Sequence, residues 1–443
     1  MSILNTKLTP SDKAQAYGMR LLTKAGGLDA VKNDGLRKRL EKILYSGAKQ
    51  GFKAQTVAGK AFAKKSGSGA PVRATPSRPK SVFDLNPTED QAMIAEAARE
   101  IADEVLRPAA AQADTDRALP DKVRAQAAEM GLTLVGVPAE LGGIAEEASA
   151  VTGVLVLEQL ARGDMGLAVA LMSSAAVAGA IANYGDAAQQ ATFLPAFTDE
   201  TDPATGALGI QEPQPLFDPA KPATTAIRQG DDIVINGTKA LVPGADSRDL
   251  FIVSALLDGS PRLIIVEPGT QGLRHDDDPA MGIRAAKTGQ LILENVTVPA
   301  ANVLGTAADH ADAVRRARLA WAAAAVGTGT AVLDQLKGYT KERKAFGEPI
   351  AYRQAVAFTV ANIAIEVDGL RLVVLRAAAL LDAGKDACAQ IAHARSLAAR
   401  HLTEVGSNAV QMLGGHGFVK EFDNERWYRD LRATGVLEGT LYV

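Results

Sequence analysis

The sequence predicts a mainly helical α+β chain in which a sheet region lies between two helical regions. Apolar residues recur at helical spacing before about residue 200 and again after Gly305. Between Gly206 and Gly305, short runs of β-forming residues alternate with Pro and Gly. A chain of 443 residues usually needs more than one hydrophobic core, so we expect two or three domains.

The first 80 residues differ in charge from the rest of the chain. They carry 17 Lys or Arg against 4 Asp or Glu, a net charge of +13, so residues 81–443 carry −16 of the total of −3. We expect a basic helical extension over 1–65 and a small, Pro-rich linker over 66–82. The extension suits an anionic membrane surface or an acidic protein partner, and its few aromatic residues argue against nucleic acid.

Helical patterns cover the first region of the body, 83–203. Thr88 and Gln91 form a possible capping box for a helix that Pro108 is expected to end. A second helix is expected over Val123–Met130. The uncharged run Met165–Ala182 reaches membrane-spanning length but consists mainly of Ala, Gly and Ser, so we interpret it as a tightly packed helix of a bundle.

Strand patterns dominate the second region, 204–306. Asn236-Gly237 is a strong hairpin signal, so we expect a turn there between the strands Asp232–Ile235 and Thr238–Val242. Further strands are expected over Leu250–Leu257, Leu263–Val266 and Gln290–Val298. Their spacing favours a small antiparallel barrel or sandwich. In the third region, 307–443, long helices are predicted over Asp309–Thr340, Tyr352–Ala383 and Asp386–Leu413.

Several common classes of chemistry are excluded by pattern. The single cysteine rules out an internal disulfide framework and, with no secretory signal, favours a cytoplasmic location. No phosphate-binding loop and no nicotinamide-type glycine fingerprint are found. The five histidines make no zinc pattern, and we expect no metal. Any chemistry is therefore expected to need a cofactor.

Several short strings, in order and spacing, give the chain a family resemblance over about Phe83–Val443. They are Gly131-Leu132, Glu158-Gln159-Leu160-Ala161-Arg162, Glu212-Pro213, Asn236-Gly237-Thr238-Lys239, Met281-Gly282-Ile283-Arg284, Arg343-Lys344-Ala345-Phe346-Gly347, Gln411-Met412-Leu413-Gly414-Gly415, Trp427-Tyr428-Arg429-Asp430 and Glu438-Gly439-Thr440. Together they resemble the acyl-CoA dehydrogenase family. The resemblance implies an N-terminal helical domain, a central antiparallel β-barrel or sandwich, and a C-terminal four-helix bundle.

The resemblance also implies a reaction and its base. A saturated acyl-CoA would lose its α-proton to a carboxylate and its β-hydride to FAD, giving the trans-2-enoyl-CoA. Glu438 occupies the family's catalytic segment, and burial in an apolar pocket would raise its pKa towards neutrality. Some relatives place the base before an arginine of the helix after the sheet, but Ala317 stands there before Arg318. We expect Arg318 and Gly439 to contact the substrate.

The resemblance assigns a set of residues to the flavin. Arg343 would pair with a phosphate and Phe346 would stack, both across a subunit boundary. The remaining expected cofactor-binding residues are Ile210, Gln211, Gln354, Gln411, Gly414, Gly415 and Thr440. A site shared between two chains implies a homodimer or homotetramer, and the family's electron acceptor is an electron-transfer flavoprotein.

The sequence departs from the family pattern around the flavin ring. Gln211 replaces a threonine, although its amide can still hydrogen-bond the ring; Phe217 replaces a serine. Pro243 stands in place of a threonine and offers neither a hydroxyl nor an N–H. The family's Ser-Glu-Ile-Gln continuation and final helix do not follow Thr440. Two alternatives therefore remain: a flavin oxidase or monooxygenase of the same fold, and a catalytically silent or structural subunit of a heteromeric enzyme.

Overall fold

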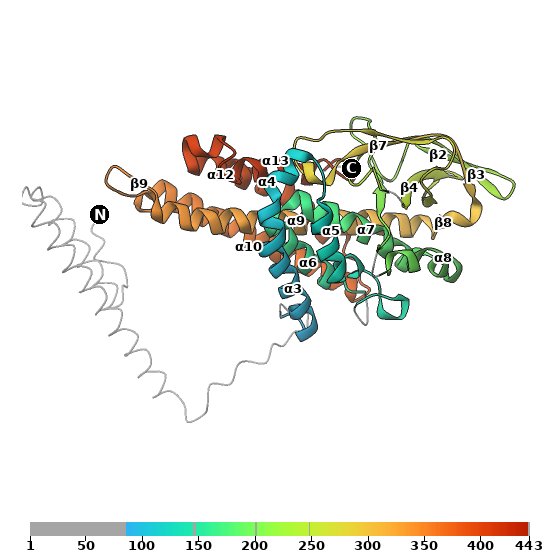
Figure 1. The fold of residues 1–443 in the computed structure, drawn as a ribbon, viewed down its shortest axis with the longest axis horizontal. Helices are drawn as coiled ribbons and strands as arrows, with labels where there is room; N and C mark the ends of the chain where they lie inside the picture. Colours follow the sequence, from blue (N-terminus) through green and yellow to red (C-terminus); the bar gives the residue numbers. More distant parts are fainter. Residues whose placement is uncertain (1–85, 145–147, 200–201, 248, 442–443) are drawn as a thin grey trace, which may run out of the picture. The chain divides into compact units, whose positions relative to one another are not determined.

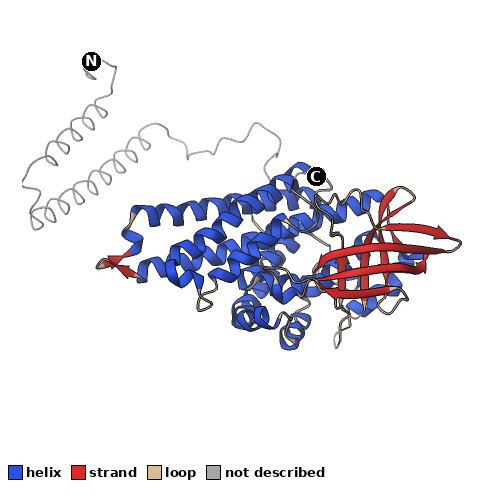
Figure 2. Ribbon diagram, turned by 90° about the horizontal axis from the view of Figure 1, so that it is seen from above, coloured by secondary structure: helices blue, strands red, loops and turns tan. Residues whose placement is uncertain are grey.

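A computed structural model describes residues 86–144, 148–199, 202–247 and 249–441 of the chain (Figure 1). The predicted extension, 1–65, and the linker, 66–82, lie outside the described residues. In the described part, helices and strands occupy separate regions, with the sheet at one end and the longest helices running away from it (Figure 2). The order of elements is helices, strands, helices, as the sequence predicts.

The first helices of the body are α3 (Glu89–Ile101), α4 (Arg107–Asp116), α5 (Asp121–Glu129), α6 (Ala150–Gly163), α7 (Met165–Tyr184) and α8 (Ala187–Phe197). The capping box at the start of α3 is confirmed, because the Thr88 hydroxyl accepts from the Gln91 N–H and the Gln91 side chain accepts from the Thr88 N–H. The expected end of this helix at Pro108 is wrong. A π-helical turn over Ala102–Leu106 joins α3 to α4, and Pro108 lies in the first turn of α4, where its missing N–H needs no partner.

Helix α7 is the only described helix long and apolar enough to cross a membrane by length and composition. Most of it is buried inside the protein, where it packs against α6, α9 and strand β1. Asp164 caps its N-terminus by accepting from the Leu167 N–H at 2.9 Å. These contacts agree with the interpretation of α7 as a packed bundle helix.

The strands are β1 (Gly206–Gly209), β2 (Thr225–Gln229), β3 (Asp232–Val242), β4 (Leu250–Leu257), β5 (Ser260–Val266), β6 (Leu273–Asp277), β7 (Gly289–Pro299) and β8 (Val303–Leu304). They form one sheet in the order β6-β7-β3-β2-β4-β5-β8, and β1 adds to β4. Most pairs are antiparallel, but β4 pairs in parallel with both β1 and β2. The sheet is therefore mainly antiparallel, as the sequence predicts, with two parallel pairings that the sequence did not predict.

The hairpin expected at Asn236-Gly237 is also wrong. Strand β3 runs through both residues, and its pairing with β7 shifts register there, as in a β-bulge. Gly237 is required because a Cβ would lie 2.5 Å from the Thr224 hydroxyl. The actual hairpin joins β2 to β3 through Gly230, whose φ of +63° suits a tight turn.

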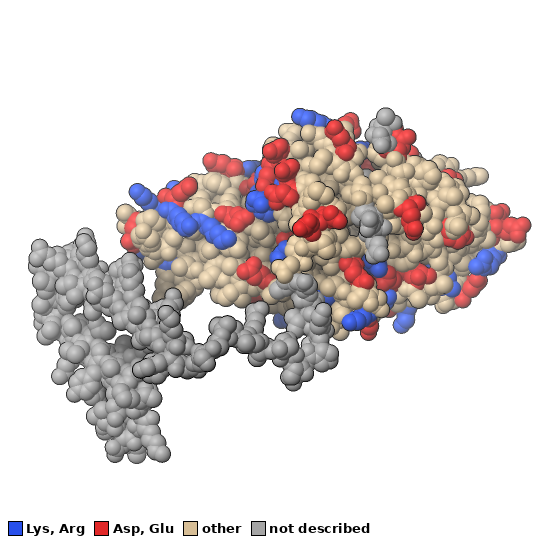
Figure 3. Space-filling model, turned by 90° about the horizontal axis from the view of Figure 1, so that it is seen from below, with Lys and Arg blue, Asp and Glu red and all other residues tan. Residues whose placement is uncertain are grey.

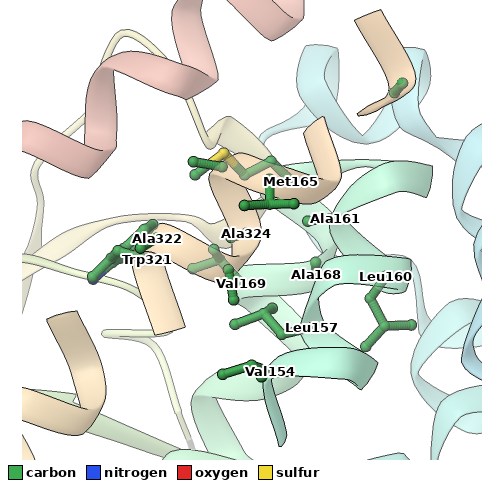
Figure 4. Packing of buried hydrophobic residues seen from close by; sticks show 14 of the residues in the cluster. Val154, Leu157, Leu160, Ala161, Met165, Ala168, Val169, Trp321, Ala322 and Ala324 are labelled. Atoms are coloured by element: carbon green, nitrogen blue, oxygen red, sulfur yellow. The ribbon is translucent and has the colours of Figure 1, made fainter. Parts of the chain in front are cut away.

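The C-terminal helices are α9 (Ala307–Glu342), α10 (Gln354–Asp382), α11 (Cys388–Leu397), α12 (Thr403–Leu413) and α13 (Asn424–Leu431). A π-helical turn, Ala398–Leu402, joins α11 to α12, so three long helical runs and the short α13 make up this region. The two-stranded hairpin β9 (Lys344–Ala345) and β10 (Glu348–Pro349) connects α9 to α10. Helix α9 packs closely on α6, and Figure 4 shows Leu157 of α6 and Val169 of α7 beside Ala324 and Trp321 of α9.

Candidate active site

Glu438 lies in the interior, at a point where the C-terminal segment passes α9. Its side chain is 8% exposed, and one carboxylate oxygen accepts from the indole N–H of Trp321 at 2.5 Å. Burial raises the pKa of Glu438, against the opposing effects of Arg395, the Trp321 hydrogen bond and Arg318. A buried carboxyl with a raised pKa is suited to taking a proton near neutral pH.

Two arginines hold the backbone around Glu438. Arg318 of α9 donates from Nε to the Glu438 carbonyl at 3.0 Å. Arg395 of α11 donates from Nη2 to the Leu437 carbonyl at 2.6 Å and to the Gly439 carbonyl. Glu438 itself has a φ of +55°, a left-handed conformation that costs a non-glycine residue of order 1 kcal/mol. The surrounding contacts hold the base in this strained conformation.

Gly439 and Thr440 fasten the same segment to the loop after β1. The Gly439 N–H donates to the Gln211 side-chain oxygen at 2.8 Å, and the Thr440 N–H donates to the Phe217 carbonyl at 3.2 Å. Gly439 has a φ of +93°, and a Cβ there would lie 2.6 Å from Pro219 and 2.9 Å from Arg318. Gln211 thus supports the segment that carries Glu438, a contact that sequence analysis did not anticipate.

A buried ion pair stabilises the loop after β1. The Glu212 carboxylate accepts from the Lys239 ammonium at 2.7 Å and from the backbone and hydroxyl of Thr224. Burial lowers the pKa of Lys239 to about 8, although Glu212 opposes that shift. Burial acts to raise the pKa of Glu212, but Lys239 and the Thr224 donors lower it. Both charges are therefore fully paired in the interior, and Glu212 has a structural role.

An apolar cavity adjoins the Glu438 carboxylate. Its inner part, of about 110 Å³, is lined by Glu438, Trp321 and Pro243 among others. Its outer part, of about 230 Å³, lies between α6, α7 and α9. The two parts share Leu157, Met172, Ala176, Leu208, Ala317 and Ala320, and so form one channel that leads to the base.

The other expected cofactor residues lie at a distant end of the same helices. Arg343, Phe346 and Gln354 surround the β9–β10 hairpin, and Phe346 is 95% exposed. Gln411, Gly414 and Gly415 are exposed where α12 ends, and the Tyr339 hydroxyl of α9 links the two sets by a 3.4 Å hydrogen bond to His416. Arg343 follows Trp321 by 22 residues on α9, so about 33 Å of helix separates it from Glu438. These residues therefore lie far from Glu438 within one chain.

The Glu438 region suits a flat, largely apolar ring with polar edges. Leu208 and Pro243 line the cavity beside Glu438 with apolar atoms, and Ile210 is buried in the core. The Thr440 hydroxyl is buried without a hydrogen-bond partner among the described residues, as expected of a group kept for a ligand. The residues present therefore fit a flavin. No cluster of potential metal ligands occurs in the described part of the chain.

Comparisons with known proteins match this architecture along the whole body. Three family models match in order: the acyl-CoA dehydrogenase N-terminal domain over residues 88–201, the middle domain over 207–296 and the C-terminal domain over 310–443. The chain belongs to the acyl-CoA dehydrogenase family. It is an FAD-dependent oxidoreductase that acts on the CH–CH group of acyl-CoA.

Individual relatives resemble this chain over about four-fifths of its length. It is 32% identical over 370 residues to an acryloyl-CoA reductase (NADH) of Anaerotignum propionicum, covering 81% of this chain and 93% of the relative. It is 34% identical over 364 residues to a cyclohex-1-ene-1-carbonyl-CoA dehydrogenase of Geobacter metallireducens, covering 80% and 95%. The solved butyryl-CoA dehydrogenase of Megasphaera elsdenii matches with a TM-score of 0.75 and 28% identity, covering 81% and 97%.

Two residues that contact the Glu438 segment were missed from the sequence. Trp321 contacts the carboxylate of Glu438, and Arg395 contacts the carbonyls on either side of it. Trp321 is one of only two tryptophans and occurs in a run of alanines, a signal that could have drawn attention to it. Arg395 carries no comparable signal, because nothing in its helical sequence separates a buried arginine from an exposed one.

Proposed function

We propose that Glu438 is the base that removes the α-proton of a bound acyl-CoA. The observation that carries this proposal is a buried carboxylate at the inner end of an apolar channel, held by Trp321 and flanked by two guanidinium groups. The thioester carbonyl acidifies the α-hydrogen, and the Glu438 carboxylate accepts that proton. When bound, FAD supplies the acceptor for the β-hydride, so the α–β single bond becomes a double bond.

The channel is suited to the acyl chain. Its walls are mostly apolar and include the small residues Gly153, Ala176 and Ala320 from three different helices. An acyl chain there would exclude water from Glu438, which keeps the base desolvated and its pKa raised. We also propose that Arg318 and Gly439 contact the substrate, because Arg318 donates to the Glu438 carbonyl and Gly439 follows Glu438 directly.

The distant residues support a second part of the proposal, a homodimer or homotetramer. Arg343, Phe346, Gln354 and the Gln411–Gly415 turn are exposed in one chain, and they offer a cation, an aromatic ring and exposed glycines to a dinucleotide. On the face shown in Figure 3, several basic side chains lie at the end of the body that carries the β9–β10 hairpin, with acidic ones among them. We propose that this end completes the FAD site of a second copy.

The proposed partners are an acyl-CoA and an electron-transfer flavoprotein as electron acceptor. The solved relatives include a protein studied with the electron-transferring flavoprotein of Acidaminococcus fermentans, 30% identical to this chain. Membrane contact through residues 1–65 and a cytoplasmic location remain proposals that rest on the sequence alone. A retained base argues against the monooxygenase and silent-subunit alternatives, because neither requires a carboxylate at this position.

The test is the substitution Glu438→Gln in the holoenzyme. Anaerobic addition of acyl-CoAs of different length should bleach the flavin of the native protein, and the variant should bleach ~10²–10⁴-fold more slowly because it lacks the base. Glu404→Gln, an exposed substitution on α12, is the matched control and should bleach at the native rate. Unchanged bleaching in Glu438→Gln would remove Glu438 from the mechanism.

A further inference from the structure

Arg395 is a charged side chain in the interior, and only one nitrogen of its guanidinium group is hydrogen-bonded. It is 2% exposed, and only Nη2 has partners, the carbonyls of Leu437 and Gly439. Its Nε and Nη1 atoms are buried with no hydrogen-bond partner among the described residues. Burial lowers its pKa to about 10, a shift that Arg318 reinforces and Glu438 opposes. At neutral pH the buried guanidinium therefore keeps its positive charge.

A buried positive charge with two unpaired N–H donors destabilises the folded state. Charged groups in protein interiors are therefore usually paired with an opposite charge and hydrogen-bonded. Here no carboxylate lies within ion-pair distance of the Arg395 guanidinium in the described part of the chain. The carboxylate that interacts with its charge is Glu438. Stabilising the ionised form of the Glu438 carboxylate would account for the burial of the Arg395 charge.

The position of Arg395 gives it control over the backbone of the base as well. Its two hydrogen bonds bridge the residues before and after Glu438, so one planar group fixes the peptide units on both sides. Glu438 needs such support because its φ of +55° is disfavoured. Arg318 holds the intervening carbonyl, and Trp321 orients the carboxylate itself.

We propose that Arg395 is a positioning residue that fixes the backbone on both sides of Glu438 and electrostatically favours the carboxylate form of that base. The inference rests on the proposed role of Glu438. The charged groups that face the base are Arg395 of α11 and Arg318 of α9, with Asp218 of the loop after β1 acting on Arg318. Arg395 is the one of these that bridges two peptide groups.

The test uses Trp321 as a reporter of Glu438 ionisation in the full-length holoprotein. Because the indole N–H contacts the carboxylate, the tryptophan fluorescence should change as Glu438 titrates, and Glu438→Gln identifies that component by removing it. Arg395→Met should raise the pH midpoint of this fluorescence change by about one unit, because it removes a positive charge that favours the Glu438 carboxylate. It should also slow flavin bleaching and move the pH profile of bleaching upwards.

Two further variants separate charge from geometry. Arg395→Lys keeps the charge but has no planar fork, so its midpoint should stay near the native value while bleaching slows. Arg400→Met, exposed on the same helical run, should match the native protein in both measurements. The proposal is overturned if Arg395→Met shows the midpoint and rate of Arg400→Met, or if Arg395→Lys bleaches at the native rate.

The measurements also distinguish this inference from the proposed function. A shifted fluorescence midpoint in Arg395→Met supports the electrostatic role even if Glu438→Gln bleaches normally, a result that would refute only the catalytic role of Glu438. If Arg395→Met does not fold, the fluorescence midpoint and the bleaching rate of Arg395→Lys test the proposal instead. Thermal unfolding of each variant shows whether a slow rate reflects a damaged fold.

Discussion

The pocket around Glu438 and the exposed end around Phe346 lie along the same long helix but are built differently. In the pocket, side chains of the same chain hold the carbonyls of Leu437, Glu438 and Gly439. At the other end, Phe346 is 95% exposed, and its described ring contact is with the Arg353 guanidinium at 5.6 Å. The segment that carries Glu438 is thus held by contacts within one chain, whereas the ring of Phe346 is left open to solvent. The difference is one between a buried carboxylate held from several sides and an exposed aromatic ring with few contacts.

The largest expected effect tests whether the stability of the protein depends on the buried Lys239–Glu212 ion pair near the pocket. Lys239→Met removes the partner of Glu212 and leaves a buried carboxylate unpaired, so the free energy of unfolding should fall by about 3–5 kcal/mol. Lys287→Met is the matched control, because the Lys287–Asp246 pair is exposed and should contribute no more than about 1 kcal/mol. Urea unfolding of the two variants measures the difference. Equal losses would mean that burial does not distinguish the two pairs.

The second largest effect tests whether each active site combines residues from two chains. Glu438→Gln and Arg343→Glu should each reduce activity by about 100-fold or more, the first through the base and the second through FAD binding. If each site takes Glu438 from one chain and Arg343 from another, a mixed dimer carries one intact site and one doubly altered site. Random exchange should then restore about a quarter of native activity, because half of the dimers are mixed.

The outcome of this mixing experiment is decisive for the comparison. Recovery after joint refolding or co-expression, with no recovery when the purified variants are combined without exchange, supports the shared site. Absence of recovery in co-expressed, purified mixed dimers would mean that Arg343 and Glu438 serve the same site of one chain. FAD content, read from the visible spectrum, should be low in Arg343→Glu and normal in Glu438→Gln.

The two regions also differ in what the sequence could predict. The start of α7 at Met165 followed from local pattern, and the burial of Glu438 followed from the family strings, because both are encoded within a few residues. The Arg395 contacts join residues more than 40 positions apart, so only the folded chain brings them together. The bulge at Gly237 was mistaken for a turn because its glycine is needed for contact with Thr224, a residue of a different segment. Exposure of Phe346 agrees with the family resemblance, which placed this ring at a subunit boundary, whereas residue type alone would place a phenylalanine inside.

The smallest expected effect tests the shape of the channel. Gly153 of α6 lines its outer part, and a Cβ built there meets no atom within 4 Å, so a larger side chain would project into the space proposed for the acyl chain. Gly153→Leu should lower kcat/KM about tenfold for long or branched acyl-CoAs, since lost space costs of order 1–3 kcal/mol, and change it little for short ones. Gly338→Leu, at an exposed position of α9, gives the same gain in helix propensity without touching the channel, and should leave every substrate unaffected. An equal loss for short and long substrates in Gly153→Leu would instead place the acyl chain outside this channel, and the apolar lining would then belong to packing between α6, α7 and α9.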